Sequence, residues 1–162
     1  MTFLKKYGSE ILEAVLIFLA LFIFFYPAQV DGISMEDTLS HGDIIMMSRT
    51  MAFAGIYDKG DIVVFEYEDG KKEINVIKRI VAVEGDKVES ENGCLYINGE
   101  IQDGYLCEND FSVTIDEGYV FVLGDNPDES TDSREFGEIL KDNIKARAII
   151  KLWPVTEIKS LF

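Results

Sequence analysis

The chain has 162 residues, the length of one ordinary domain. Its 15 Lys and Arg residues and 30 Asp and Glu residues give a formal net charge of −15 at pH 7. This charge argues against a nucleic-acid-binding module and against a polybasic patch for anionic lipid, because both need a cationic face. The single histidine and two cysteines exclude most His-ligated zinc sites and any four-thiolate metal site.

The chain begins with an apolar segment that differs from the rest of the sequence. Residues 11–27 read ILEAVLIFLALFIFFYP, in which Glu13 is the only charge. A segment of this length lies at the short end of what spans a bilayer. We therefore predict a transmembrane anchor over 11–28, a cytoplasmic tail over 1–10 before it, and one extracytoplasmic domain over 29–162.

Flanking charges predict the orientation of this segment in the cell membrane. Lys5 and Lys6 precede it, and the next basic residue after it is Arg49. By the positive-inside rule, the N-terminus is cytoplasmic and the following domain lies outside. A cleaved signal peptide and a buried core helix are the alternatives. No Ala-x-Ala-like cleavage site follows the segment, and a core helix without a polar face needs a large helical core.

The remainder reads as short runs rich in Val, Ile, Phe and Tyr, separated by glycine-containing turns. Asn92-Gly93 and Asn98-Gly99 are typical hairpin turns, because a type I′ turn needs positive φ at both central residues. No segment after the anchor shows a helical period longer than two turns. The predicted fold is therefore mainly β, with antiparallel strands at 43–49, 61–68, 73–83, 94–97, 111–115, 119–123 and 145–153.

Lys78 lies in the middle of one of these strands. Side chains alternate faces along a strand, so the face that Lys78 shares is otherwise apolar. That face carries Ile74, Val76, Ile80 and Ala82. Such a lysine either loses solvation, which lowers its pKa and makes it a base near neutral pH, or lies at an edge where its amine reaches water.

Two other segments carry polar groups. Ser34 follows the predicted anchor in a glycine-containing loop, where a serine is ordinarily only a loop residue. Residues 124–137 place carboxylates, three hydroxyls and one arginine between two glycines. This second segment lacks the glycine and the twelfth-position glutamate of an EF-hand, so an acidic surface loop is its plain alternative.

Together these segments resemble the type I signal peptidases, membrane-anchored serine proteases that remove signal peptides. The nucleophile motif of that family is similar to residues 34–39, Ser-Met-Glu-Asp-Thr-Leu. Residues 60–65, 78–86 and 124–137 look like the next three family motifs, in the same order. The resemblance covers nearly the whole chain and implies a barrel-like, antiparallel catalytic β-domain. A lysine at position 78 points to the bacterial type.

The resemblance also implies roles for individual residues. Ser34 would be the nucleophile and Lys78 its general base, which has to be neutral and therefore buried. Ser130 would orient the lysine amine, and Asp132 and Arg134 would form a supporting ion pair. No cofactor or metal is implied.

The implied substrate is the signal peptide of a secreted preprotein, with small residues (Ala-x-Ala) before the cut. It would bind as an added strand between residues 29–33 and 74–77 through main-chain hydrogen bonds. The partner of the anchor would be the lipid bilayer, and the oligomeric state stays open. The positions that match substrate-binding residues of the family are Val30, Gly32, Met35, Leu39, Val76 and Ile77.

The sequence departs from the family pattern at two positions. Asp37 stands where the family has a proline, and an aspartate can hold a similar turn through its own backbone. Gly32 stands where some members have a hydroxyl residue that helps the oxyanion hole. A glycine there is typical of the short, Gram-positive-like members, in which the hole would depend on the Ser34 backbone N–H.

Two other functional classes are compatible with parts of the sequence. A self-cleaving Ser/Lys repressor-type protease shares the dyad, but it would carry an N-terminal DNA-binding helical domain in place of the apolar segment. A non-catalytic, membrane-tethered β domain leaves the combination of Ser34, Lys78 and Ser130 unexplained.

Two structural questions stay open from the sequence. Residues 51–57 are apolar and either dip into the membrane interface or belong to the core. Cys94 and Cys107 lie on the predicted exterior side, where a disulfide is permitted. A two-residue turn at 98–99 pairs position 94 with 103, so a bridge to Cys107 needs a bulge in the second strand.

Overall fold

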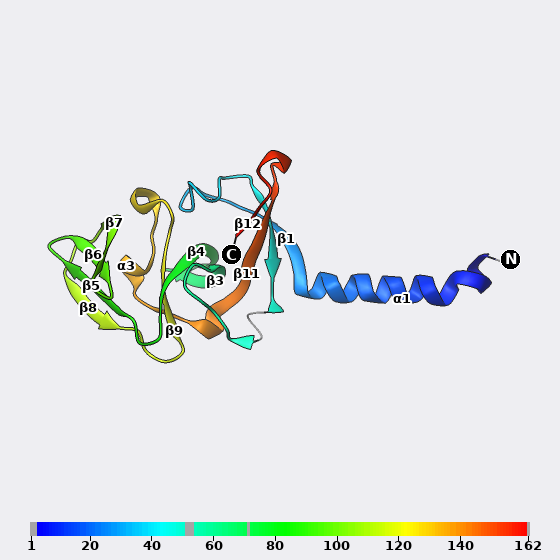
Figure 1. Ribbon diagram of the computed structural model, residues 1–162, viewed down its shortest axis with the longest axis horizontal. Helices are drawn as coiled ribbons and strands as arrows, with labels where there is room; N and C mark the ends of the chain where they lie inside the picture. The colour runs from blue at the N-terminus through cyan, green and yellow to red at the C-terminus, as the bar shows by residue number, and fades with distance from the viewer. Residues whose placement is uncertain (1–2, 51–53, 71, 162) are drawn as a thin grey trace.

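The computed structural model describes residues 3–50, 54–70 and 72–161 (Figure 1). One long helix, α1 (Phe3–Phe24), extends away from a body built of β-strands. The described residues after this helix form strands, turns and short helical segments such as α3 (Ser133–Phe136). The prediction of a mainly β, antiparallel domain after one N-terminal helix is confirmed.

Helix α1 contains an 18-residue window, Tyr7–Phe24, that is long and apolar enough to cross a bilayer. None of this window is buried inside the structure, although most of its side chains are aliphatic or aromatic. A helix that is apolar on all sides and is not buried by the described part of the protein is suited to an apolar environment outside the protein. The alternative of a buried core helix is therefore wrong.

The helix ends at Phe24, four residues before the predicted end of the anchor at residue 28. Pro27 supplies the reason, because the residue before a proline is disfavoured in the α conformation. Residues Phe25–Gln29 instead form strand β1, which pairs antiparallel with β2 (Ile44–Ser48). The helix also begins at Phe3, inside the predicted tail.

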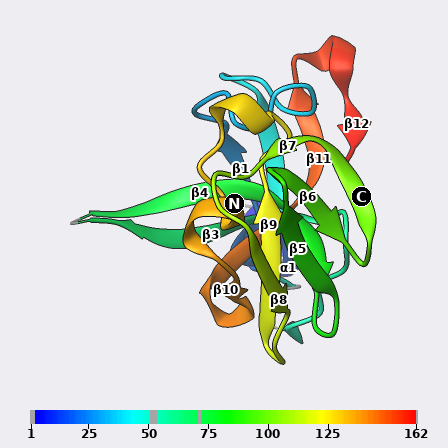
Figure 2. The same cartoon turned by 90° about the vertical axis from the view of Figure 1, so that its left-hand side faces the viewer.

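The larger sheet has the strand order β1-β2-β11-β3-β4-β9-β10, with β12 paired to β11, and its strand pairs are antiparallel. Its strands β3 and β4 form a long hairpin that projects beyond the rest of the body (Figure 2). Besides β1 and β2, the strands of this sheet are β3 (Ile62–Asp69), β4 (Lys72–Val83), β9 (Tyr119–Leu123), β10 (Ile139–Leu140), β11 (Ile144–Trp153) and β12 (Lys159–Ser160).

The smaller sheet lies at the end of the body opposite α1 (Figure 1). Its order is β7-β6-β5-β8, formed by β5 (Lys87–Glu91), β6 (Cys94–Ile97), β7 (Glu100–Leu106) and β8 (Phe111–Thr114). Strands β5 and β7 were not among those that the sequence predicts. Both are rich in polar residues and β7 is largely exposed, so neither shows a clear run of apolar side chains.

Three buried apolar clusters form the core. The first, which includes Val30, Met35 and Leu39, lies beneath the loop that carries Ser34. The second contains Phe65 and Ile80 and fills the other face of the β3–β4 hairpin. The third joins the two sheets and comprises Ala82, Val88, Leu95, Ile97, Ile115, Phe121 and Leu123. The loop that carries Ser34 is thus packed onto the large sheet.

The structure answers the question of a disulfide between Cys94 and Cys107, and in part the question of where residues 51–57 lie. Cys94 and Cys107 are free thiols, because a bulge in β7 pairs Cys94 with Leu106 and leaves Cys107 one residue further along, where its N–H donates to the Gly93 carbonyl. In the apolar segment 51–57, residues 51–53 lie outside the described residues. Within the rest, Tyr57 is buried in the core and Ile56 is 57% exposed.

Candidate active site

Residues 30–43 connect β1 to β2 and are called here the nucleophile loop. The loop turns tightly after Ser34, since the N–H groups of Thr38 and Leu39 both donate to the Met35 carbonyl. Met35 and Leu39 are buried, with exposed fractions of 1% and 0%, and tie the loop to the core. Ser34 therefore stands on a loop whose apolar side chains fix its position.

Asp37 within this loop has φ +49, in the left-handed region. The proline ring locks φ near −65°, so a proline does not fit the backbone here. The expected similarity between this turn and a proline-containing turn is therefore wrong for the conformation of residue 37. Aspartate is one of the few residues other than glycine that adopt such a φ readily.

The structure brings together Ser34 and Lys78, which are 44 positions apart in the sequence. Lys78 Nζ donates to Ser34 Oγ at 2.7 Å. Lys78 is only 3% exposed on β4, so the edge-lysine alternative, in which its amine reaches water, is wrong.

Burial lowers the pKa of Lys78 from its ordinary value of 10.5, and this desolvation is the largest effect on the group. The carboxylates of Asp132 and Asp125 oppose the shift, whereas the Arg134 guanidinium adds to it. Only part of the predicted apolar face contributes to this desolvation of Lys78. Ile80 is buried, but Ile74 is 41% exposed and lies beyond the region that covers the amine.

The three predicted supporting residues form one hydrogen-bonded cluster. Asp132 is fully buried and caps the start of α3. Its Oδ1 accepts from Arg134 Nε at 2.9 Å, which is the implied ion pair. Its Oδ2 accepts from Ser130 Oγ at 2.8 Å. The Ser130 hydroxyl thus donates to Asp132, and no hydrogen bond joins it to Lys78 among the described residues, in contrast to its implied role.

Gly124 lies between this cluster and the nucleophile loop and allows the two to pack closely. It follows β9, and its N–H donates to Asp132 Oδ2 at 3.0 Å. A Cβ atom at this position would collide with the Ser130 side chain on one side and the Ser34 carbonyl oxygen on the other. Only a residue without a side chain lets Ser130 and the nucleophile loop approach so closely.

Sequence reasoning did not assign roles to the residues that hold the nucleophile loop from this side. The Asn126 backbone N–H donates to the Ser34 carbonyl, and its side-chain amide donates to the Ile33 carbonyl. Arg79, next to the base, binds Asp125 with two hydrogen bonds of 2.8 and 2.6 Å. Asp125 and Asn126 lie in a predicted motif, but their partners are distant in sequence and only the fold reveals them.

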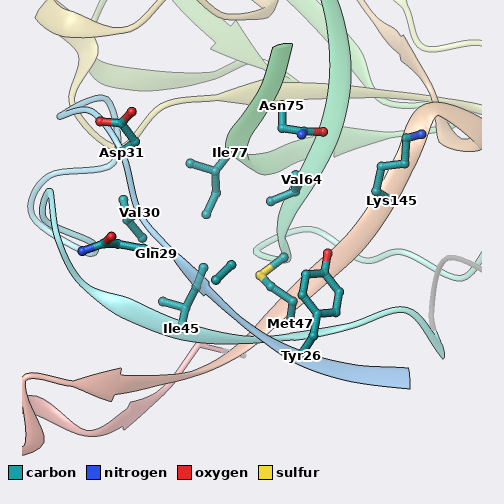
Figure 3. A pocket seen from close by; sticks show the side chains of 11 residues that line it. Tyr26, Gln29, Val30, Asp31, Ile45, Met47, Val64, Asn75, Ile77 and Lys145 are labelled. Atoms are coloured by element: carbon teal, nitrogen blue, oxygen red, sulfur yellow. The ribbon is translucent and has the colours of Figure 1, made fainter. Parts of the chain in front are cut away.

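A groove of about 360 Å³ lies between β1 and β4 (Figure 3). Its lining includes Val30, four positions before Ser34, and Ile77, the neighbour of Lys78 in the sequence. One side is formed by the end of β1 and the start of the nucleophile loop, and the other by β3 and β4. Its apolar wall is made of Ala28, Val30, Ile45, Met47, Val64 and Ile77, and its polar rim of Tyr26, Gln29, Asp31, Asn75 and Lys145.

The six predicted substrate-binding residues divide between this groove and other places. Val30 and Ile77 line the groove. Met35 and Leu39 lie in the buried cluster beneath it. Val76 points to the opposite face of β4 and packs against the second cluster. Gly32 is exposed with φ +99, and its N–H donates to His41 Nδ1.

A buried lysine hydrogen-bonded to a loop serine, beside a groove with an apolar wall, defines a site suited to a serine peptidase with a lysine base. Residues 4–153 match the family model described as signal peptidase, peptidase S26. The chain belongs to this family of signal peptidases, which are serine peptidases.

Two sequence relatives agree with this assignment. Signal peptidase I of Bacillus licheniformis is 33% identical over 165 residues, covering 92% of this chain and 88% of the relative. Signal peptidase IB of Staphylococcus aureus strain COL is 32% identical over 185 residues, covering 95% of each chain. A crystal structure of a signal peptidase I from Enterococcus faecalis V583 matches 57% of this chain and 96% of its own, with 27% identity and a TM-score of 0.44.

Proposed function

We propose that this protein is a membrane-anchored endopeptidase that removes N-terminal signal peptides from secreted preproteins, with Ser34 as nucleophile and Lys78 as general base. The observation that carries the proposal is the 2.7 Å hydrogen bond between Lys78 Nζ and Ser34 Oγ, made by a lysine that is 3% exposed. Family membership supplies the substrate class, and the site supplies the chemistry.

The reaction follows from the state of the lysine. A neutral Lys78 amine accepts the hydroxyl proton as Ser34 Oγ attacks the scissile carbonyl. The resulting ammonium gives that proton to the leaving amine of the mature protein, and an acyl-enzyme remains on Ser34. Lys78 then deprotonates a water molecule, which releases the signal peptide. The oxyanion is stabilised by the Ser34 backbone N–H, because Gly32 offers no hydroxyl.

The groove receives the residues before the cut as an added strand. Strand β1 pairs with β2 along one edge, and β4 pairs with β9 only from Arg79 onward, so residues 72–78 of β4 have a backbone edge without a strand partner among the described residues. Free edges on both sides of a groove favour an extended peptide bound through main-chain hydrogen bonds. The wall at Val30 and Ile77 favours small apolar side chains, which supports a preference for Ala-x-Ala.

Helix α1 holds this site at the membrane surface. It contains the bilayer-length window Tyr7–Phe24, and Lys5 and Lys6 precede that window. The N-terminus then lies in the cytoplasm and the catalytic domain over 29–162 outside the cell membrane, where signal peptides emerge. The bilayer is thus a second partner of the chain.

Cleavage of a model preprotein by the full chain in detergent tests the proposal. Wild-type protein should release the signal peptide, and Lys78→Ala and Ser34→Ala should not. Lys87→Ala is a matched control, because Lys87 forms an exposed ion pair with Glu89 on the small sheet. Cleavage by Lys78→Ala at more than a few per cent of the wild-type rate would show that the dyad is assigned wrongly.

A further inference from the structure

A buried ion pair lies at the base of the nucleophile loop, apart from the residues assigned to the reaction. Lys151 on β11 is 3% exposed, and Asp43 at the end of the loop is 5% exposed. Lys151 Nζ lies 2.7 Å from Asp43 Oδ2 and 2.7 Å from Glu157 Oε2. The Glu157 side chain is 59% exposed, so Asp43 is the buried partner.

Asp43 closes the loop through both its backbone and its side chain. The Val30 N–H donates to the Asp43 carbonyl at 2.8 Å, and the Gly42 N–H donates back to the Val30 carbonyl at 2.9 Å. The Ser40 N–H donates to Asp43 Oδ2 at 2.8 Å, so the oxygen that binds Lys151 also shapes the last turn of the loop. The two ends of the loop therefore meet at Asp43, the residue whose side chain Lys151 binds.

The loop has anchors on two opposite sides. Asn126 holds Ile33 and Ser34 from the side of the catalytic cluster, and Lys151 holds Asp43 from the side of β11. Val30, which is tied directly to Asp43, is four positions before the nucleophile and lines the groove. A shift at the base would thus be transmitted to Ser34 Oγ, and a misplacement of about 1 Å in a reacting group can cost about 10²-fold in rate.

We propose that Lys151 is a positioning residue for the peptidase reaction: through Asp43 it fixes the base of the nucleophile loop and so holds Ser34 Oγ against Lys78. The inference rests on the proposed function of the Ser34–Lys78 site. Glu157 has no part in this positioning, because it binds the same amine from the exposed side and no hydrogen bond or ion pair joins its side chain to the loop among the described residues.

Four variants of the full chain test the assignment, with Tm measured for each. In Lys151→Met and in Asp43→Asn, kcat per titrated active site should fall about tenfold or more while KM changes less than about twofold. Lys151→Arg keeps the ion pair and should restore most of kcat. Glu157→Gln is the matched control and should stay within about twofold of wild type.

A loss of stability alone would lower Tm and the fraction of active sites without changing kcat per site. If Lys151→Met does not fold, Asp43→Asn carries the test, because its amide oxygen still accepts from the Ser40 N–H. Wild-type kcat per site in Asp43→Asn, or an equal loss in Glu157→Gln, would overturn the inference. Failure of the proposed function has a different signature, namely that wild type does not cleave or Lys78→Ala does.

Discussion

The two sheets of this molecule treat charged side chains in opposite ways. The large sheet and its loops bury ionisable groups that bind an oppositely charged side chain or the nucleophile, namely Asp43, Asp61, Lys78, Asp132 and Lys151. The small sheet keeps its ion pair in solvent, with the Lys87 and Glu89 side chains 53% and 33% exposed. Both pairs of lysine and partner are equally short, at 2.7 Å for Lys87–Glu89 and for Lys78–Ser34.

This difference shows where the fold tolerates the free-energy cost of burying charged side chains. Removing a charge from water costs free energy that its partner offsets only in part, whereas an exposed pair contributes little either way. The large sheet uses that cost at Lys78, because desolvation is what makes its amine a usable base. Charged residues around the nucleophile should therefore be sensitive to substitution, and those of the small sheet should not.

The largest expected effect is the loss of either member of the dyad. Ser34→Ala and Lys78→Ala should each abolish preprotein cleavage with the fold intact, because each removes one half of a single proton transfer. The double variant should be little worse than either single one, since members of one catalytic unit are not additive. Rates of all three variants, measured beside far-UV circular dichroism, check this. His41→Ala should be nearly silent, and a large loss there would revive a histidine-based mechanism.

The second largest effect is expected from a proline at position 37. Asp37→Pro would force a residue with φ +49 toward −65° in the turn that follows Ser34, so we expect a large drop in kcat and a stability loss of more than about 1 kcal/mol. Asp37→Gly is the control, because glycine adopts positive φ freely and should retain activity. Thermal melts and cleavage rates compare the two. Full activity in Asp37→Pro would mean that the loop adopts another turn.

The pH dependence of the reaction probes the burial of Lys78 directly. Burial lowers the pKa of this lysine from 10.5, and the neutral form is the active base, so kcat/KM should rise with pH. The midpoint of this limb should lie below 10.5, the ordinary pKa of a lysine. A kcat/KM profile with no limb below about pH 9.5 would show that the base is solvated.

Much of the site was predictable because its groups lie in short motifs. The resemblance placed Ser34, Lys78 and the Asp132–Arg134 pair, and the structure brings all four residues together. Strand alternation was the available signal that the sequence prediction did not use fully. The sequence prediction named both Val76 and Ile77 as substrate-binding positions, although neighbours on a strand face opposite sides and only Ile77 lines the groove.

What the sequence could not supply depends on contacts between distant segments. The partner of Arg79 and the pairing of Lys151 with Asp43 both arise from strand order, which no local pattern encodes. The end of α1 is a different case, because Pro27 marks it in the sequence. The continuous run of apolar residues hid the change from helix to strand, since such side chains occur both in a bilayer-length helix and in a strand.

The smallest effect on activity is expected in the small sheet, at Cys94 and Cys107. Both are free thiols, and neither contributes to the Ser34–Lys78 contact. Cys107 packs against the cluster that joins the sheets, so Cys94→Ser with Cys107→Ser should lower Tm and leave kcat/KM within about threefold of wild type. Intact mass after alkylation without reductant should show two modified thiols, and a disulfide would contradict the pairing of Cys94 with Leu106. Arg134 makes this prediction demanding, because Cys107 lies close enough to help raise the pKa of Arg134, and Arg134 binds Asp132. A large loss of turnover in a folded double variant would mean that the small sheet helps to set the charge balance around Lys78, and the contrast between the two sheets would then be weaker than their exposure suggests.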